Sequence, residues 1–327
     1  MKKVNRTLAV WTSIGLVGSA WAAPFSLFAA ESAAGSNGNN TALYGAVRQY
    51  GFSGTGGVAN SGPGLPATAL NDPVGLAFRN GKLYIGNRHG NTLGLGSVQS
   101  ADWNGTVLSN VTTVATQTQS SEQGFHGIGF APNGDLFATT VNDGTIRYRN
   151  SGSGYVKIGK TTSGAVRDAW ISPDGKKLFE TTTGSVIRVT DLTAGGFGSF
   201  ADFNVAGASA MHQMAWANGA LFVTSFNTSR VFRVTLDSGF VPTGSSEVAN
   251  VAGAIGVAFS PDGNEMFVSR HSVGGISRLS WNGSSWADSG LIQTGTSMGY
   301  LQTVPEPASI LAVGAGLAVA LRRRRPR

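Results

Sequence analysis

Cysteine is absent from the 327 residues of the sequence, and charged residues make up only 13% of it. The lack of cysteine excludes disulfide bonds, thiol chemistry and cysteine-ligated metal sites. The scarcity of charge, together with 47 glycines, favours a fold with many tight turns and an uncharged polar surface, which suits an exported protein. The length is ample for one large β domain.

The net charge of +7 belongs to the two ends of the chain. Lys2, Lys3 and Arg6 stand at the amino end, and five arginines stand within the last six residues. Once these eight residues and Glu306 are set aside, 16 basic and 16 acidic residues remain. The part of the chain between the ends is therefore neutral, and we expect no nucleic-acid partner, because such a partner requires a basic patch on the domain.

A strand-turn-strand pattern occurs five times along the chain. Residues 255–270 show it most plainly, because large apolar residues alternate with small ones, a Ser-Pro-Asp-Gly turn follows, and a second apolar strand comes next. The aromatic residues before the turns recur every 40 to 52 residues and are Phe78, Phe130, Trp170, Trp216 and Phe259. A repeat of this length and pattern is typical of the four-stranded blades of a β-propeller.

The third predicted strand of each unit after the first carries an arginine. These residues are Arg147, Arg188, Arg233 and Arg278, and we interpret them as ties between neighbouring blades. The repeats resemble the NHL, YVTN and WD40-like propeller families over about residues 41–303. The resemblance implies an all-β fold, a propeller of five to six four-stranded blades, and it implies no particular activity.

The chain divides into four predicted segments. Residues 1–22 have a basic start, an apolar run and a small-x-small site at residues 20–22, which is typical of a secretory signal peptide. Residues 23–40 are predicted to be a flexible leader, because residues 31–40 are rich in Gly, Ser and Asn. The propeller is predicted over residues 41–303, and residues 304–327 form a separate C-terminal tail.

The number of blades depends on how the ring closes. Residues 44–52 are expected to add an outer strand, and residues 298–302 to start an inner one. Five blades with extra edge strands and a sixth blade shared by the two ends both agree with the sequence. The sixth blade is favoured, because shared closure hides edge strands from aggregation.

The C-terminal tail has three parts. It starts with Val304, Pro305, Glu306 and Pro307 and continues with an apolar segment over residues 308–321. It ends in a basic cluster that contains Arg322, Arg323, Arg324 and Arg325. The 14 apolar residues predict a short helix of about 21 Å. This is less than the hydrocarbon core of a bilayer, about 30 Å, so a transient contact with the inner membrane is expected rather than a permanent anchor.

This tail closely resembles the PEP-CTERM sorting signal. The four residues 304–307 match the core of the signal, and the order of motif, apolar helix and arginine cluster matches as well. The resemblance implies export by the general secretion machinery, recognition and cleavage by an exosortase, and delivery to the surface or exopolysaccharide matrix of a Gram-negative bacterium.

The candidate site residues gather at one face of the predicted ring. In up-and-down blades, the start of the inner strand and the loop after the second strand share a face, and all four histidines fall at such places. An alignment of the inner strands places Arg167 and Gln213 at a position that is otherwise Gly, and Asp168 at a position that is otherwise apolar. The predicted binding residues are His89, His126, Arg167, Asp168, His212 and His271, with Glu122 as an optional member.

Two interpretations of these residues remain open. They form a polar site for a sugar, a metal or acid-base chemistry, or Asp168 is paired with Arg167 or a third-strand arginine and the histidines are hydrogen-bonded at the rim. No catalytic residue is assigned, and whether the chain is an enzyme stays undecided.

The leading functional hypothesis is an exported, surface-sorted propeller that binds polysaccharide or other envelope components without a cofactor. The alternative is a propeller enzyme of the lyase or lactonase type that uses the His/Asp funnel with a divalent metal. A third hypothesis is a spacer without a ligand.

Overall fold

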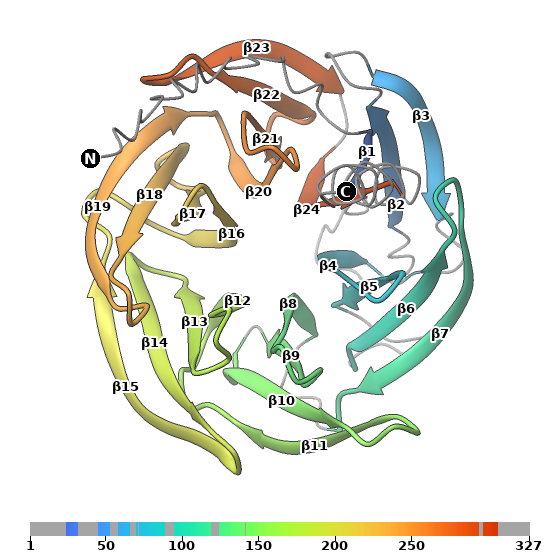
Figure 1. Ribbon diagram of the computed structural model, residues 1–327, viewed down its shortest axis with the longest axis vertical. Coiled ribbons are helices and arrows are strands. Elements are labelled where there is room, and N and C mark those ends of the chain that lie inside the picture. The colour runs from blue at the N-terminus through green and yellow to red at the C-terminus, as the bar shows by residue number, and fades with distance from the viewer. Residues whose placement is uncertain are drawn as a thin grey trace, which may run out of the picture.

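Six antiparallel sheets of four strands stand around a central channel, as Figure 1 shows. This computed structural model describes residues 24–31, 45–52, 58–65, 70, 72–88, 95–118, 124–140, 142–293 and 297–306. In each sheet the strands follow one another from the channel outward, and every pairing is antiparallel. The predicted all-β propeller of four-stranded blades is confirmed, and of the two closures the six-bladed one is formed.

Five blades each come from one continuous stretch of chain. Blade 1 contains β4 (Pro73–Arg79), β5 (Lys82–Asn87), β6 (Ser97–Trp103) and β7 (Leu108–Thr116). Blade 2 contains β8 (Phe125–Phe130), β9 (Leu136–Thr140), β10 (Thr145–Asn150) and β11 (Tyr155–Lys160). Blade 3 contains β12 (Val166–Ile171), β13 (Lys177–Thr182), β14 (Val186–Thr193) and β15 (Gly196–Asn204). Blade 4 contains β16 (Met211–Ala217), β17 (Ala220–Ser225), β18 (Arg230–Leu236) and β19 (Pro242–Asn250). Blade 5 contains β20 (Ala254–Phe259), β21 (Glu265–Arg270), β22 (Ile276–Trp281) and β23 (Trp286–Gln293).

The closing blade joins the two ends of the chain. It contains β24 (Met298–Pro305), β1 (Phe25–Glu31), β2 (Ala46–Phe52) and β3 (Val58–Leu65), in this order from the channel outward. Residues 298–302 therefore do start an inner strand. Residues 46–52 form the third strand of the blade, whereas an outer one was expected.

The predicted leader over residues 23–40 is wrong for Phe25–Glu31. This segment is a strand between β24 and β2, and six of its seven residues are buried. The physical reason is that its apolar run covers the gap between the closing blade and its neighbours, where Phe25 packs against Phe52 and Phe267. The propeller accordingly runs from Phe25 to Pro305. The predicted signal peptide and apolar C-terminal helix lie outside the described residues.

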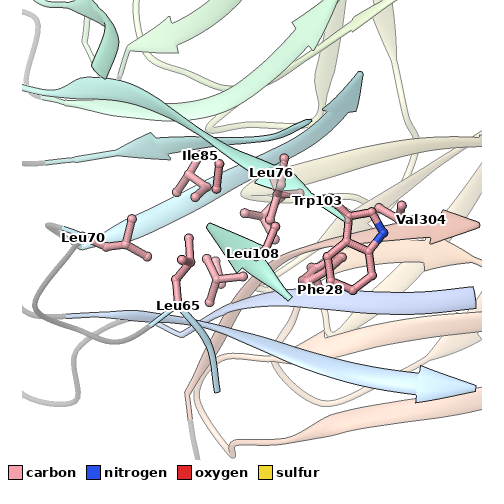
Figure 2. Packing of buried hydrophobic residues seen from close by; sticks show 12 residues of the cluster. Phe28, Leu65, Leu70, Leu76, Ile85, Trp103, Leu108 and Val304 are labelled. Atoms are coloured by element: carbon pink, nitrogen blue, oxygen red, sulfur yellow. The ribbon is translucent and has the colours of Figure 1, made fainter. Parts of the chain in front are cut away.

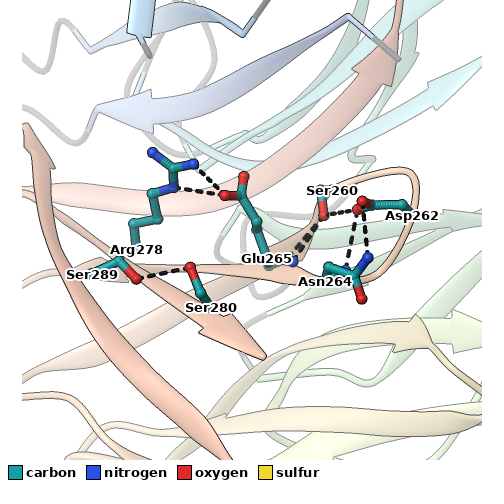
Figure 3. Close-up of polar contacts among 7 residues, drawn as sticks. All are labelled: Ser260, Asp262, Asn264, Glu265, Arg278, Ser280 and Ser289. Carbon is teal, nitrogen blue, oxygen red and sulfur yellow. Dashed lines mark hydrogen bonds and ion pairs between the residues drawn. The ribbon is translucent and has the colours of Figure 1, made fainter. Parts of the chain in front are cut away.

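The repeated turn has the chemistry that its sequence predicts. In blade 5 the Ser260 hydroxyl donates to the Asp262 carboxylate at 2.5 Å and accepts the Glu265 amide at 2.9 Å, and Figure 3 shows these bonds. Gly263 has a φ of +71°, which glycine adopts without strain, and its amide donates to the Ser260 carbonyl at 2.8 Å. Ser172 makes the equivalent bonds in blade 3. These turns fix where each inner strand ends.

Three of the four third-strand arginines are held by carboxylates. Arg147 pairs with Asp135 inside its blade at 2.7 Å and also donates to two carbonyls of blade 3, so it ties neighbouring blades as expected. Arg188 pairs with Asp202, and Arg278 pairs with Glu265 (Figure 3), each within one blade. Arg233 has no ion pair or hydrogen bond among the described residues.

Apolar clusters between adjacent blades form the core. The cluster between the closing blade and blade 1 includes Phe28, Leu76, Trp103 and Leu108, and Val304 of β24 lies among them with an exposed fraction of 0% (Figure 2). Burial of side chains of this size stabilises by about 1.5–3 kcal/mol each. The closing strand is therefore a permanent part of the core. Within the described part of the chain, no helix is long and apolar enough to cross a membrane.

Candidate functional site

The central channel has two different ends. We call the end where the inner strands begin the histidine end, because β8 and β16 carry His126 and His212 as their second residues and His271 directly follows β21. We call the other end, where the inner strands enter their turns, the turn end. The three described histidines lie at the same end of the ring, as predicted, and His89 lies outside the described residues.

A β-bulge near the start of each inner strand shapes the histidine end. The pairing register shifts between Phe125 and Ile128 in blade 2, between Val166 and Asp168 in blade 3, and between Met211 and Met214 in blade 4. Blades 1 and 5 have the same shift, and in the closing blade the extra residue lies on β24, between Met298 and Leu301. Bulges of this kind leave residues unpaired and redirect side chains. His126, Arg167 and His212 all lie within these bulges.

Second-strand hydroxyls, which sequence reasoning missed, fasten the bulges. Thr139 donates to the Arg167 carbonyl at 3.0 Å, and Thr181 donates to the His212 carbonyl at 2.8 Å, so each links its blade to the next. Thr224 and Ser269 make the same link in blades 4 and 5. A signal was present in the sequence, because each hydroxyl stands two residues after a phenylalanine: Phe137, Phe179, Phe222 and Phe267.

These hydroxyls also correct the alignment of the inner strands. Thr139 accepts the amide of Gly127, Ser269 accepts that of Gly256, and Thr181 accepts that of Asp168. Asp168 therefore replaces a glycine, and its expected match with the apolar third position is wrong by one residue. The spacing to the turn carries the same information, since Asp168 precedes Ser172 by four residues as Gly256 precedes Ser260.

Asp168 is a buried carboxylic acid that bonds to the backbone of the next blade. Its Oδ2 accepts the Met214 amide at 2.7 Å, and among the described residues it has no salt bridge, so the expected pair with an arginine is not formed. Burial raises the pKa of Asp168 to about 8, against the lowering effect of the Met214 and Ala169 amides. The group is thus largely protonated at neutral pH and acts as a link between β12 and β16.

Gln213 occupies the equivalent position in blade 4 and has a similar task. Its Oε1 accepts the amides of Val257 at 2.9 Å and Leu301 at 2.8 Å, and its Nε2 donates to the Leu301 carbonyl at 2.7 Å. One side chain thus joins blade 4 to blade 5 and to the closing blade. The polar side chains at this depth therefore hydrogen-bond mainly to the backbone of other blades.

Tyr300 crosses the channel. It comes from β24, and its hydroxyl donates to the Arg167 carbonyl in blade 3, on the opposite side of the ring, at 2.8 Å. The ring of Tyr300 is buried between Val74 and Ile255. Burial raises its pKa well above the usual value. Sequence reasoning missed Tyr300, because the closing strand lacks the turn that identifies the other inner strands.

At the histidine end two imidazoles are kept neutral by burial. Burial, helped by the nearby Arg167 and His271, lowers the pKa of His212 to about 3. Burial also lowers the pKa of His271, whose Nδ1 is 2.8 Å from the Ser297 hydroxyl. The Phe226 ring lies about 6.0 Å from both imidazoles. His212 is therefore close to both His271 and Arg167, and His126 lies at the same end of the ring on β8.

No metal centre is formed by the described residues, because no three of their His, Asp and Glu side chains gather in the required geometry. The optional member Glu122 and His89 lie outside the described part of the chain. Arg88, which precedes His89, is paired with the buried Asp72.

The turn end contains a cavity of about 590 Å³. Asp168 and Gln213 line it from the channel side, and Trp216, Asn218 and Gln302 line it toward the rim. The volume lies in the range of cavities that hold small ligands. The cavity therefore combines amide and aromatic groups. Of the predicted site residues that the structure describes, Asp168 lines it, whereas His126, Arg167, His212 and His271 do not.

An aromatic cluster forms one wall of this cavity. Trp170 and Trp216 are stacked, with ring centroids 5.2 Å apart and an interplanar angle of 18°. Phe240 packs against both rings, and Trp216 keeps 36% of its surface exposed. On the opposite wall, Arg79 lies over Phe130 and donates to two carbonyls of the next blade. A flat aromatic surface is thus presented beside polar groups.

The C-terminal end of the chain carries a known signal. The PEP-CTERM protein-sorting motif matches residues 303–325, as the sequence predicts. This motif marks a secreted protein that is sorted to the cell surface in Gram-negative bacteria, and it implies processing by an exosortase.

Solved structures share the fold at low sequence identity. A periplasmic gluconolactonase of Pseudomonas aeruginosa is 13% identical, with 87% of this chain and 100% of that chain covered and a TM-score of 0.59. A chain of the nidogen/laminin complex is 13% identical over 86% and 98% of the two chains, with a TM-score of 0.64. A putative 6-phosphogluconolactonase of Bacteroides uniformis is 14% identical over 86% and 99%, with a TM-score of 0.56. No curated protein matches the sequence. At this identity the likeness concerns the fold alone.

Proposed function

We propose that this protein is an exported, surface-sorted β-propeller that binds a polysaccharide of the cell envelope or matrix in the cavity at the turn end. The sorting motif supports the address, and the cavity supports binding. The proposal keeps the ligand class expected from the sequence and moves the site from the histidine end to the turn end.

The stacked pair of Trp170 and Trp216 beside the cavity carries this proposal. The face of an indole ring is negative, and the C–H groups of a pyranose ring are weakly positive and apolar, so the two surfaces attract each other. Amide groups such as those of Asn218 and Gln302 suit the hydroxyl groups around the edge of a sugar. Few charges are needed for such recognition, in agreement with the composition of the chain.

The histidine end supports a structural role better than a binding role. Tyr300 fills the channel below it, and the carbonyl of Arg167 and the carboxyl of Asp168 already bond to other blades. His212 is partly buried and is neutral in the folded protein at pH 7, because desolvation lowers its pKa to about 3. These contacts stabilise the ring of blades, and among the described residues they do not align an acid with a base for catalysis.

Sorting and the closing strand overlap in the sequence. Val304 is in the core, Pro305 pairs with Phe25, and the amide of Glu306 donates to the Pro24 carbonyl at 3.1 Å. We therefore place the processing cut on the C-terminal side of Glu306 and the signal-peptide cut before Pro24. Mass spectrometry of the surface protein should find Val304 retained and Arg322 to Arg327 missing. A mature C terminus upstream of Val304 would contradict this placement.

Calorimetric titration of the mature protein, purified from the host surface, with the host's own exopolysaccharide tests the binding proposal. We expect saturable binding that weakens about tenfold or more in Trp216→Ala, because truncation of a central aromatic contact costs this much in other interfaces. Phe200→Ala is the matched control, since Phe200 is 54% exposed on the outer strand of blade 3 and far from the cavity lining. Equal affinity of the wild type and Trp216→Ala, with both folded, would refute the proposed site.

A further inference from the structure

Arg233 differs from the other third-strand arginines. Arg147, Arg188 and Arg278 each hold a carboxylate, whereas Arg233 holds none among the described residues. Arg233 is partly buried in the middle of β18. A guanidinium has five N–H donors and no acceptor, so a side chain without a carboxylate partner can bind one from a ligand.

The strand register shows that blade 4 lacks the carboxylate that pairs with the third-strand arginine in two other blades. In blade 2 Arg147 lies opposite Phe137, and Asp135 stands two residues before that phenylalanine. Blade 5 repeats this arrangement with Glu265 before Phe267. In blade 4 Arg233 lies opposite Phe222, and the residue two positions earlier is Ala220. An alanine therefore stands where two other blades supply the carboxylate.

Arg233 lines a second cavity, of about 780 Å³, between blades 4 and 5. Trp281 and Trp286 form another wall, with ring centroids 5.4 Å apart, and Trp281 keeps 40% of its surface exposed. Glu247 lines the same cavity, and its carboxylate is bound by Arg230 at 3.0 Å. The cavity thus offers one unpaired cation beside an aromatic surface.

The two cavities adjoin at Asn218, which lines both of them. The Asn218 side chain donates to the Gly263 carbonyl at 2.9 Å and lies flat against that residue. A Cβ at Gly263 would be only 2.4 Å from the Asn218 amide oxygen, so a glycine is required for this close approach. Because the two cavities share Asn218 as a lining residue, one extended ligand could contact both of them.

We propose that Arg233, Trp281 and Trp286 form a subsite for an acidic sugar unit in a polysaccharide chain that continues from the turn-end cavity. This inference rests on the proposed function and adds the charge of the polymer to it. The carboxylate of a uronic acid takes the place of the missing Asp or Glu, and a guanidinium binds such a group through two parallel hydrogen bonds. The ring of the same sugar lies on the exposed face of Trp281.

The test compares an acidic uronate-containing polysaccharide with its carboxyl-reduced, neutral form on the mature protein. We expect the wild type to bind the acidic form about tenfold or more tightly, and Arg233→Gln to bind both forms alike. Added salt should weaken acidic binding of the wild type more than that of Arg233→Gln. Lys176→Gln, an exposed charge change on a turn of blade 3, is the matched control and should retain the preference.

A second variant tests the register argument. Ala220→Asp restores the carboxylate that blade 2 has at this position, so Arg233 should become paired and the acidic preference should disappear while neutral binding stays. If Ala220→Asp fails to fold, Arg233→Gln still decides the question. Equal binding of both polymers by the wild type, or an acidic preference retained in Arg233→Gln, would overturn the subsite and leave the proposed function standing. If the wild type binds neither polysaccharide, both the subsite and the proposed function are overturned.

Discussion

The two ends of the channel differ in how the repeat has been altered. Between the histidine end and the turn-end cavity, the exceptional residues Asp168 and Gln213 direct their polar groups to the backbones of neighbouring blades, and Tyr300 closes the passage. At the turn end Trp170 and Trp216 keep the aromatic character of the repeat, with tryptophan in place of phenylalanine, and form the wall of an open cavity. A polar departure from the repeat therefore marks a ring fastener, whereas the proposed binding surface uses an aromatic position that the blades share.

Truncation of Tyr300, which separates the two ends of the channel, should have the largest effect on stability. Tyr300→Ala removes a fully buried aromatic ring and a hydrogen bond across the ring, so we expect a loss of about 3–5 kcal/mol in the free energy of unfolding. Tyr300→Phe removes only the hydroxyl and should cost about 1 kcal/mol. Urea denaturation measures both. A Tyr300→Ala protein as stable as the wild type would show that the channel is not closed by this residue.

The pH dependence of stability should come next. The folded-state pKa of Asp168, about 8, lies above its ordinary value of 3.8, so the folded protein holds one proton more than the unfolded chain between these values. Unfolding free energy should therefore fall as pH rises through this window, by up to about 1.4 kcal/mol per pH unit.

His212 acts in the opposite sense between pH 3 and 6.5, because its folded-state pKa is lowered to about 3. The fall due to Asp168 is therefore clearest from about pH 6.5 to 8. Asp168→Asn keeps an oxygen that can accept the Met214 amide and should lose this slope. Denaturation curves at pH 6.5 and 8 measure it, and parallel behaviour of the two proteins would contradict the assignment of a protonated Asp168.

The second-strand hydroxyls should contribute less. Thr181→Val removes the donor to the His212 carbonyl and the acceptor for the Asp168 amide while it keeps the volume, so we expect a loss of about 1–2 kcal/mol. Thr112→Val, at a hydroxyl on the outer strand of blade 1, is the control and should change stability by less than about 0.5 kcal/mol. If the two variants are equally stable, the blades are not fastened in this way.

Substitution of the histidines should have the smallest effect, and the measured quantity is the affinity for the polysaccharide. The double variant His126→Ala/His212→Ala alters the end opposite to the proposed site, so its affinity for the polysaccharide should stay within about twofold of the wild type, although its stability falls. A loss of binding comparable to that of Trp216→Ala, in a folded double variant, would return the site to the histidine end.

The fold could be predicted from the sequence because its evidence is local. Turn residues such as those at 260–263 and alternating strands identify five blades, and each blade repeats the same short-range chemistry. The sorting motif is equally local. The first strand, Phe25–Glu31, was missed because its inner partner, β24, lies at the other end of the chain.

The candidate site was predicted only in part, because its geometry depends on bulges and on contacts between distant blades. The bulge at Arg167 shifts Asp168 by one position, and the role of Tyr300 depends on a residue on the far side of the ring. A cavity wall such as that of Trp216 leaves no sequence pattern of its own, because a core aromatic residue gives the same signal.

Hydrogen exchange of the mature protein with and without the host exopolysaccharide distinguishes ligand binding at the turn end from binding at the histidine end. We expect slower exchange of the amides at the turn end, at residues 216–219 and 262–264, and unchanged exchange in the loop 271–275 at the histidine end. Protection of residues 271–275 without protection of residues 216–219 would contradict this expectation.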